Sequence, residues 1–147
     1  MKGVNRHDSD PVTGYTISRE QAEKDLKLMK QHNINAVRTC HYPDQSRWYE
    51  LCDEYGIYMI GETNMETHGT WTLFDKDPVE TCIPGDKPEW QENVLDRVNS
   101  MVQRDKNHPA ILLWSCGNES FGGSNIFKMS EFMRKLDNSR LVHYAVS

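Results

Sequence analysis

The sequence predicts an α/β protein in which parallel strands alternate with helices, organised as a (β/α)8 TIM barrel. Short apolar runs alternate along the chain with longer helical patterns, and polar loops join them. No glycine-rich turn follows the first strand, which argues against an open dinucleotide-binding sheet. Polar residues instead follow successive strands, as in the active sites of barrels. The 147 residues supply about the first half of such a barrel, strands 1 to 5 and helices 1 to 4, where closure needs eight units and roughly 250 residues.

The first two units follow from helical spacing and end signals. Val4 begins a short strand, and Ser18 caps a helix whose inward face is expected to carry Ala22, Leu26 and Met29 with Leu28 beside them. Asn33 ends that helix, and 34–39 form the second strand. The helix over 45–55 buries Trp48, Leu51, Cys52 and Tyr55 and ends at Gly56.

The third strand, over 57–60, is followed by an aperiodic stretch from Thr63 to Pro88 that is long enough to be a functional loop. A third helix over 89–105 places Trp90, Val94, Val98, Met101 and Val102 on one stripe, and Pro109 follows its end. The run 110–115 is typical of a fully buried parallel strand. A fourth helix over 125–136 turns Ile126, Met129, Phe132, Met133 and Leu136 inward, and 141–146 form the fifth strand.

Composition excludes several classes of protein. A formal net charge of -5 argues against a nucleic-acid binder. The longest apolar run, 110–114, is far shorter than the roughly 20 residues that cross a bilayer. The N-terminal residues turn polar at once, so we expect no secretory signal and a cytoplasmic location. The four cysteines lack C-x-x-C spacing, which predicts buried, reduced thiols instead of a zinc site.

Glu119 is the strongest candidate for acid catalysis, because it follows the most apolar strand. Asn118 beside it can hydrogen-bond a hydroxyl group of a ligand, and Gly117 allows close approach of a substrate. A carboxyl group placed in this way can act as a general acid, which gives its proton to a leaving group. The alternative is that residues 118–120 cap the fourth helix.

Other polar residues at strand ends admit both structural and functional interpretations. Glu66 and His68, two residues apart, leave the same side of an extended chain and could share a ligand or simply be solvated. His7 and His41 follow the first two strands and are expected to face the same barrel mouth. Arg38 is as readily an internal charge paired with Glu62 as an orienting residue. We interpret Trp48, Trp90, Met129 and Met133 as packing residues, whereas Trp71 in the long loop fits either packing or a sugar platform.

Six motifs, in order, closely resemble the catalytic domain of bacterial β-galactosidases of glycoside hydrolase family 2. They span nearly the whole chain: Gly3-Val4-Asn5-Arg6-His7, Asn35-Ala36-Val37-Arg38-Thr39-Cys40-His41-Tyr42-Pro43, Trp48-Tyr49-x-Leu51-Cys52-Asp53-x-Tyr55-Gly56, Asn64-Met65-Glu66-Thr67-His68-Gly69, Arg104-Asp105-Lys106-Asn107-His108-Pro109 and Trp114-Ser115-Cys116-Gly117-Asn118-Glu119-Ser120. β-Glucuronidases share parts of this pattern, but the Glu-Thr-His-Gly stretch favours the galactosidase branch.

The resemblance implies a retaining hydrolase of terminal β-galactosides such as lactose, with residues 1–147 as the N-terminal half of its catalytic barrel. It implies Glu119 as general acid/base and His7, His41 and Asn118 as substrate-binding residues. It also implies Mg²⁺ bound by Glu66, His68 and Glu119, flanking β-sandwich domains and an oligomeric parent enzyme.

One departure is Gly61, where the family usually has Asp, so an acidic group near the site is missing. No residue matches the family's nucleophile motif, although Asp8, Asp10 and Glu62 are available carboxylates. Three alternatives stay open: a β-glucuronidase, a non-catalytic barrel fragment acting in complementation or assembly, and a metal-dependent hydrolase using His7, His41, His68 and Glu66.

Overall fold

A parallel five-stranded sheet organises the chain in the computed structural model, which describes residues 1–71 and 77–145. The strands are β1 (Gly3–Arg6), β2 (Ala36–Thr39), β3 (Tyr58–Glu62), β4 (Ile111–Asn118) and β5 (Leu141–Ala145). Their spatial order is their chain order, and every neighbouring pair is parallel. A doubly wound sheet would reverse its strand order at a switch point. Consecutive parallel neighbours are the arrangement of a partial (β/α) barrel, as the sequence predicts.

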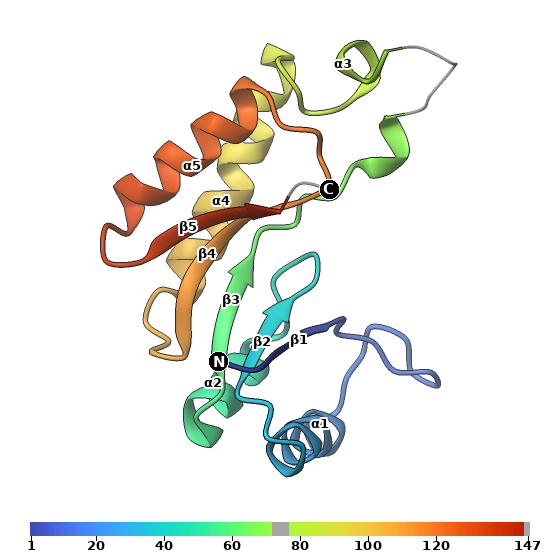
Figure 1. The fold of residues 1–147 in the computed structure, drawn as a ribbon, viewed down its shortest axis with the longest axis vertical. Helices are drawn as coiled ribbons and strands as arrows, with labels where there is room; N and C mark the ends of the chain where they lie inside the picture. Colours follow the sequence, from blue (N-terminus) through green and yellow to red (C-terminus); the bar gives the residue numbers. More distant parts are fainter. Residues whose placement is uncertain (72–76, 146–147) are drawn as a thin grey trace.

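Four long helices connect these strands. They are α1 (Arg19–Gln31), α2 (Ser46–Tyr55), α4 (Gln91–Asp105) and α5 (Ser124–Leu136). Figure 1 shows α4 and α5 side by side along β4 and β5, with α1 and α2 beside the first strands. In its described part, the loop predicted over 63–88 contains the single turns η1 (His68–Thr70) and α3 (Pro78–Thr81), and η3 (Pro88–Trp90) leads into α4.

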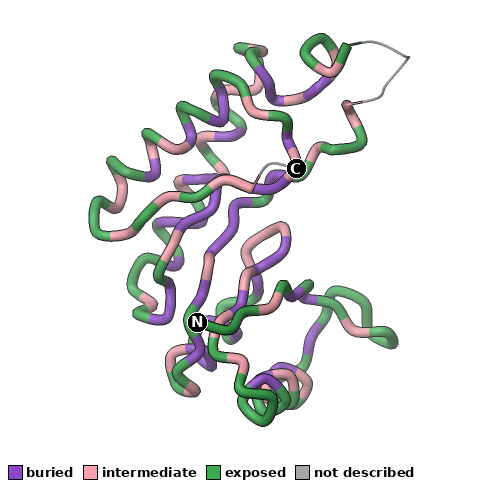
Figure 2. The backbone as a smooth tube through the Cα atoms, in the orientation of Figure 1, coloured by how far each residue is buried: buried purple, intermediate pink, exposed green. Residues whose placement is uncertain are grey.

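The apolar core lies between the sheet and these helices. Its largest fully buried side chains include Trp48, Tyr49, Trp114, Met129 and Met133. Figure 2 shows burial alternating along the helices with exposed segments, as expected for helices that cover one face of a sheet. The four cysteines are all buried and free, which confirms the predicted reduced thiols.

Some element details differ from the predictions. Leu28 is 45% exposed, because its position rotates it away from the stripe that buries Ala22, Leu26 and Met29. Trp90 lies in η3 and is only half-buried. Strand β4 continues three residues past Ser115, while Val146, predicted in the last strand, lies outside the described residues.

The proposed capping role of residues 118–120 is wrong. Helix α5 begins at Ser124 with Gly123 as its N-cap, and the Ser124 amide donates to Asp86 Oδ1. Asn118 is the last residue of β4. The carboxylate of Glu119 is therefore not used to terminate the helix.

A buried charge cluster ties β1 to the helices that follow it. The Arg6 guanidinium bonds Asp8 at 2.9 Å, Asp44 at 3.0 Å and Asp25 of α1 at 3.1 Å, and it stacks 3.8 Å from the centre of the Trp48 ring of α2. Burial, and then the charge of Asp8, raise the pKa of Asp44 to about 7. Three carboxylates on one guanidinium leave an excess of negative charge, and this favours the protonated form of the most buried one, Asp44, more than in an ordinary carboxyl group.

The sheet face opposite the helices is open and largely apolar. Tyr58 is 46% exposed, Leu112 38% and Leu141 73%. A hollow of about 240 Å³ on this face is lined by residues of β1 to β4, among them Ala36, Ile60 and Leu113. In a closed barrel this face is the interior, which is filled by side chains from all strands. No helix in the described ranges, 1–71 and 77–145, is long and apolar enough to span a bilayer.

Candidate active site at the carboxyl ends of the strands

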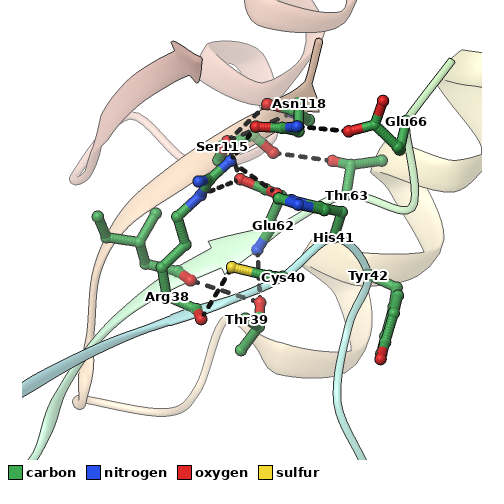
Figure 3. Close-up of polar contacts among 12 residues, drawn as sticks. Arg38, Thr39, Cys40, His41, Tyr42, Glu62, Thr63, Glu66, Ser115 and Asn118 are labelled. Carbon is green, nitrogen blue, oxygen red and sulfur yellow. Dashed lines mark hydrogen bonds and ion pairs between the residues drawn. The ribbon is translucent and has the colours of Figure 1, made fainter. Parts of the chain in front are cut away.

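Arg38 and His41, two of the polar residues singled out in the sequence, meet at one carboxylate, that of Glu62, the last residue of β3 (Figure 3). Alternation along β3 places Glu62 and Ile60 on the open face, while Met59 and Gly61 face the helices. Register pairs Ile60 with Arg38, so the Arg38 side chain on β2 lies over the same face. The Glu62 side chain is fully buried.

Both oxygens of Glu62 are occupied by hydrogen-bond donors. Arg38 donates through Nε to Oε2 at 2.6 Å and through Nη2 to Oε1 at 3.0 Å. Ser115 Oγ donates to Oε2 at 2.7 Å, and His41 Nδ1 lies 2.7 Å from Oε1. Of the two interpretations of Arg38, the pairing with Glu62 is thus present in the structure, while its bond to Asn118 Oδ1 leaves an orienting role open as well. The bonds to Glu62 also show that this residue links β2, β3 and β4.

His7 and His41 lie next to each other, as expected for side chains that follow neighbouring parallel strands. Their ring centroids are 5.4 Å apart, edge to face. Tyr42 Oη lies 3.4 Å from His7 Nδ1. Two imidazoles and a phenol thus line one part of the mouth.

Gly117 brings the loop after β3 against the end of β4. The backbone at Gly117 has φ +138°, and a Cβ built there would lie 2.5 Å from Met65 Cβ and 2.6 Å from Met65 O. Only glycine permits this approach. The Asn118 amide then donates to Met65 O at 2.8 Å, and Glu66 forms a parallel bridge with Asn118.

This contact places Glu66 and His68 beside Asn118 and Glu119. Asn118 Nδ2 donates to Glu66 Oε2, and the His68 amide donates to Glu66 Oε1 at 2.9 Å. His68 Nδ1 lies 2.6 Å from Glu119 Oε2. The side chains of His68 and Glu119 are 55% and 33% exposed, so solvent reaches the acid candidate.

Glu119 occupies a strained backbone position, with φ +39°. A non-glycine residue in this region costs about 1–3 kcal/mol, and such residues cluster at functional sites. Its conformation turns the chain so that the carboxylate faces His68 instead of continuing the alternation of β4.

Trp71, for which the sequence left packing and a sugar platform open, packs its ring 4.3 Å from that of His68 and 5.5 Å from that of Phe121. The His68 ring is therefore held by two contacts, the hydrogen bond to Glu119 and the packing against Trp71.

Glu62 and Ser115 were not among the predicted site residues. Their signal is the polarity of two residues within otherwise apolar strands; the sequence offered Glu62 as a partner for Arg38 and as an available carboxylate, but not as the centre of a hydrogen-bond network. Gly61 points away from the site: a Cβ there would lie 3.0 Å from the Trp114 ring. An acidic side chain at position 61 would therefore face the helices, and its absence does not open the site.

The other carboxylates considered as a second catalytic group are engaged elsewhere. Asp8 is buried against Arg6, and Asp10 accepts from the amides of Val12 and Thr13 in an exposed turn. Among residues 1–71 and 77–145, no three His, Cys, Asp or Glu side chains converge as a ready metal cluster. His41 contacts Glu62 and lies next to His7, whereas His68 pairs with Glu119, so the four residues of the metal-hydrolase alternative fall into separate groups.

Comparisons with known proteins agree with this geometry. The model of the glycosyl hydrolases family 2 TIM barrel domain matches residues 1–147. The chain is 58% identical over 144 residues to a β-galactosidase of Clostridium acetobutylicum and 60% identical over 145 residues to one of Priestia megaterium. These alignments cover 98% of the chain but only 16% and 14% of the two relatives. With the β-galactosidase large subunit of Lactobacillus acidophilus, identity is 51% and coverage of the relative is 23%.

Solved structures give the same fold. A β-glucuronidase from Ruminococcus gnavus in complex with a C6-substituted uronic isofagomine superposes with a TM-score of 0.80 at 28% identity, covering 99% of this chain and 24% of that one. A β-glucuronidase from Faecalibacterium prausnitzii gives 0.82 at 29% identity, with 99% and 24% covered. The sequential parallel sheet, the polar strand ends and the match over the whole chain agree, and the chain belongs to glycoside hydrolase family 2 as part of its TIM barrel domain.

Proposed function

We propose that this chain forms the acid/base side of the active site of a retaining β-galactosidase, an enzyme of carbohydrate metabolism. The observation that carries the proposal is the position of Glu119, which lies at the end of β4, partly exposed and 2.6 Å from His68. A protonated carboxyl at that point can donate its proton to the departing glycosidic oxygen, and the resulting carboxylate can then activate water.

The second carboxyl of a retaining pair, which attacks the sugar, lies about 5 Å from the acid in such enzymes. Glu62 cannot take this role, because it is buried and both its oxygens accept hydrogen bonds. The nucleophile therefore belongs to a part of the barrel other than residues 1–71 and 77–145. For the same reason we expect the isolated chain to be inactive. It would be one piece of a larger enzyme with β-sandwich domains and more than one subunit.

His7, His41 and Asn118 are proposed to bind the galactose hydroxyls. His7 and His41 lie together at one side of the mouth, and Asn118 connects to that side through Arg38, whose Nη2 lies 2.9 Å from Asn118 Oδ1. Hydrogen bonds that strengthen as the sugar approaches its transition state raise the rate, whereas equally strong binding of the ground state does not.

We propose galactose instead of glucuronic acid as the substrate sugar, because the named β-galactosidases have the higher sequence identity to this chain. The curated relatives at 47–60% identity are named β-galactosidases, whereas the superposed β-glucuronidases share 26–29%. All four cysteines are free and buried, which is consistent with a reducing cytoplasm.

We also propose that Glu66, His68 and Glu119 hold Mg²⁺. The supporting observation is the chemistry of the donors: the His68 imidazole lies 2.6 Å from the Glu119 carboxylate, and the Glu66 carboxylate accepts from the His68 backbone amide. The three side chains do not converge on one point in the structure, so they would have to draw together around the cation. Carboxylate oxygens suit a hard cation, although imidazole is a less usual ligand for it. When bound, the cation would supply a positive charge beside Glu119. The proton that is transferred is held by the chain itself, on an oxygen of the Glu119 carboxyl group.

The proposal is tested on the full-length enzyme that contains this chain, with aryl β-galactosides and aryl β-glucuronides of the same leaving group. We expect turnover of the galactoside with retention of anomeric configuration. The conservative variant Glu119→Gln keeps the shape of the side chain but cannot exchange a proton. Faster turnover of the glucuronide, or an unchanged kcat/KM in Glu119→Gln on a galactoside with a poor leaving group, would overturn the proposal.

A further inference from the structure

Glu62 is bound by more donors than charge neutralisation requires. Burial of a carboxylate is costly unless it is paired, and the two hydrogen bonds from Arg38 already provide that pairing. Yet Oε1 also lies 2.7 Å from His41 Nδ1 (Figure 3). His41 comes from the loop after β2 and is 23% exposed, so its ring joins the buried carboxylate to the open mouth.

This contact determines which nitrogen of His41 is available to a ligand. A carboxylate paired with arginine only accepts hydrogen bonds, so His41 donates to it through Nδ1. In the neutral ring, Nε2 is then an acceptor, and the ring plane is fixed by a bond to a side chain that is itself held on three elements. Metal-binding histidines are oriented in the same way: one ring nitrogen donates to a carboxylate or carbonyl, and the other binds the metal.

Glu62 itself has no freedom to move. Its amide donates to Thr39 Oγ1 at 3.0 Å, Ser115 Oγ holds Oε2 from β4, and Arg38 holds both oxygens from β2. A flexible surface carboxylate could follow a moving imidazole, but this one imposes its position on the ring.

We infer that Glu62 is a positioning residue, which fixes the tautomer and orientation of His41 so that Nε2 receives a sugar hydroxyl. The inference rests on the proposed function, since it deepens the role of His41 in binding the substrate. Glu62 touches no substrate itself and acts through the histidine.

Two variants of the full-length enzyme separate positioning from charge pairing. Glu62→Gln has nearly the same shape, but its amide group offers one acceptor oxygen where Arg38, His41 and Ser115 need two. Glu62→Asp keeps the negative charge for Arg38, and so the fold, but withdraws the carboxylate from His41 by the length of one methylene group. For both variants we expect kcat/KM on an aryl β-galactoside to fall between about 10- and 100-fold, the range found when a partner that orients a functional histidine is removed.

The decisive readout is the coupling between Glu62 and His41. In a His41→Ala background there is no ring left to position, so the Glu62→Asp substitution should lower kcat/KM by less than about threefold. A merely structural Glu62 would instead give losses that multiply, with the same fold-change in both backgrounds. Multiplying losses, or an unchanged kcat/KM for Glu62→Asp in the wild-type background, would overturn the inference.

Asp53→Asn is the matched control. Asp53 of α2 accepts from His108 Nδ1 at 2.6 Å, the same kind of carboxylate–imidazole pair, but His108 precedes β4 and so lies at the opposite end of the sheet. This variant should lower the melting temperature and leave kcat/KM within twofold. Failure of the proposed function is distinguishable, because it would appear as absent galactoside turnover by the wild type. The four enzymes with and without Glu62→Asp and His41→Ala are then compared on whichever glycoside the wild type hydrolyses.

Discussion

Replacement of Gly117 by alanine tests how closely the site depends on the contact between the loop after β3 and the end of β4. The new Cβ would lie 2.5 Å from Met65 Cβ, whereas carbon atoms in contact normally lie about 3.5 Å apart or more. Met65 must therefore retreat by about 1 Å. Alanine at φ +138° adds strain of about 1–3 kcal/mol.

The displaced backbone carries the groups that surround the acid. Retreat of Met65 stretches its 2.8 Å hydrogen bond from the Asn118 amide and moves Glu66 and His68 away from Asn118 and Glu119. Misplacement of catalytic groups by 1 Å costs about 100-fold in rate. We therefore expect Gly117→Ala in the full-length enzyme to lower kcat/KM on an aryl β-galactoside by about 100-fold, measured per folded enzyme.

Gly56→Ala serves as the control for glycine replacement as such. Gly56 has φ +65° at the end of α2, and nothing lies within 4 Å of a Cβ built there. It should cost about 1–2 kcal/mol of stability and leave kcat/KM unchanged. If Gly117→Ala folds and retains wild-type kcat/KM, the reasoning from the Met65 contact is wrong.

Three further predictions follow from the charge cluster, the metal proposal and the open sheet face. Because the folded-state pKa of Asp44 is about 7 against an ordinary 3.8, the folded state binds the extra proton. Stability should thus fall as pH rises from about 4 to 7, and less so in Asp44→Asn; parallel melting-temperature profiles of the two enzymes would refute this. Glu66→Gln should weaken Mg²⁺ binding by the chelator-treated enzyme at least about tenfold in titration calorimetry, whereas unchanged affinity would exclude Glu66 as a ligand. The isolated chain should hydrolyse no aryl β-galactoside and should self-associate through its open sheet face and edges, so an active or monodisperse monomeric chain in light scattering would contradict the half-barrel interpretation.

The sheet and its helices could be predicted from the sequence because local patterns specify them. Periodic apolar residues predicted the helices α1, α2, α4 and α5. Short apolar runs between these helices predicted the parallel strands, in the order that the sheet shows. The end of β4 was placed too early, because glycine and asparagine disfavour strands. Pairing of Asn118 with Ala145, and its bridge to Glu66, override that preference.

The polar residues that the sequence singled out at the strand ends do lie near one another, but their contacts could not be predicted. His7 and His41, and Glu66, His68 and Glu119, do lie in two neighbouring groups. The central place of Glu62 depends on the register of β2 with β3, since that register determines that Arg38 and Glu62 share a face. The hydrophobic pattern of strands of four and five residues is too short to determine this register, and the sequence has no signal for the positive φ of Glu119 that turns its carboxylate toward His68.

The most direct test of the central claim, that Glu119 is the acid/base, is the dependence of the Glu119→Gln enzyme on the leaving group and on azide. Poor leaving groups need a proton, so their kcat/KM should fall far more than that of an activated aryl galactoside. The second step needs a base to activate water, and azide attacks without one, so added azide should restore turnover and yield galactosyl azide. A variant equally slow on good and poor leaving groups, with no response to azide, would contradict the assignment and leave Glu119 as a binding or metal-holding residue.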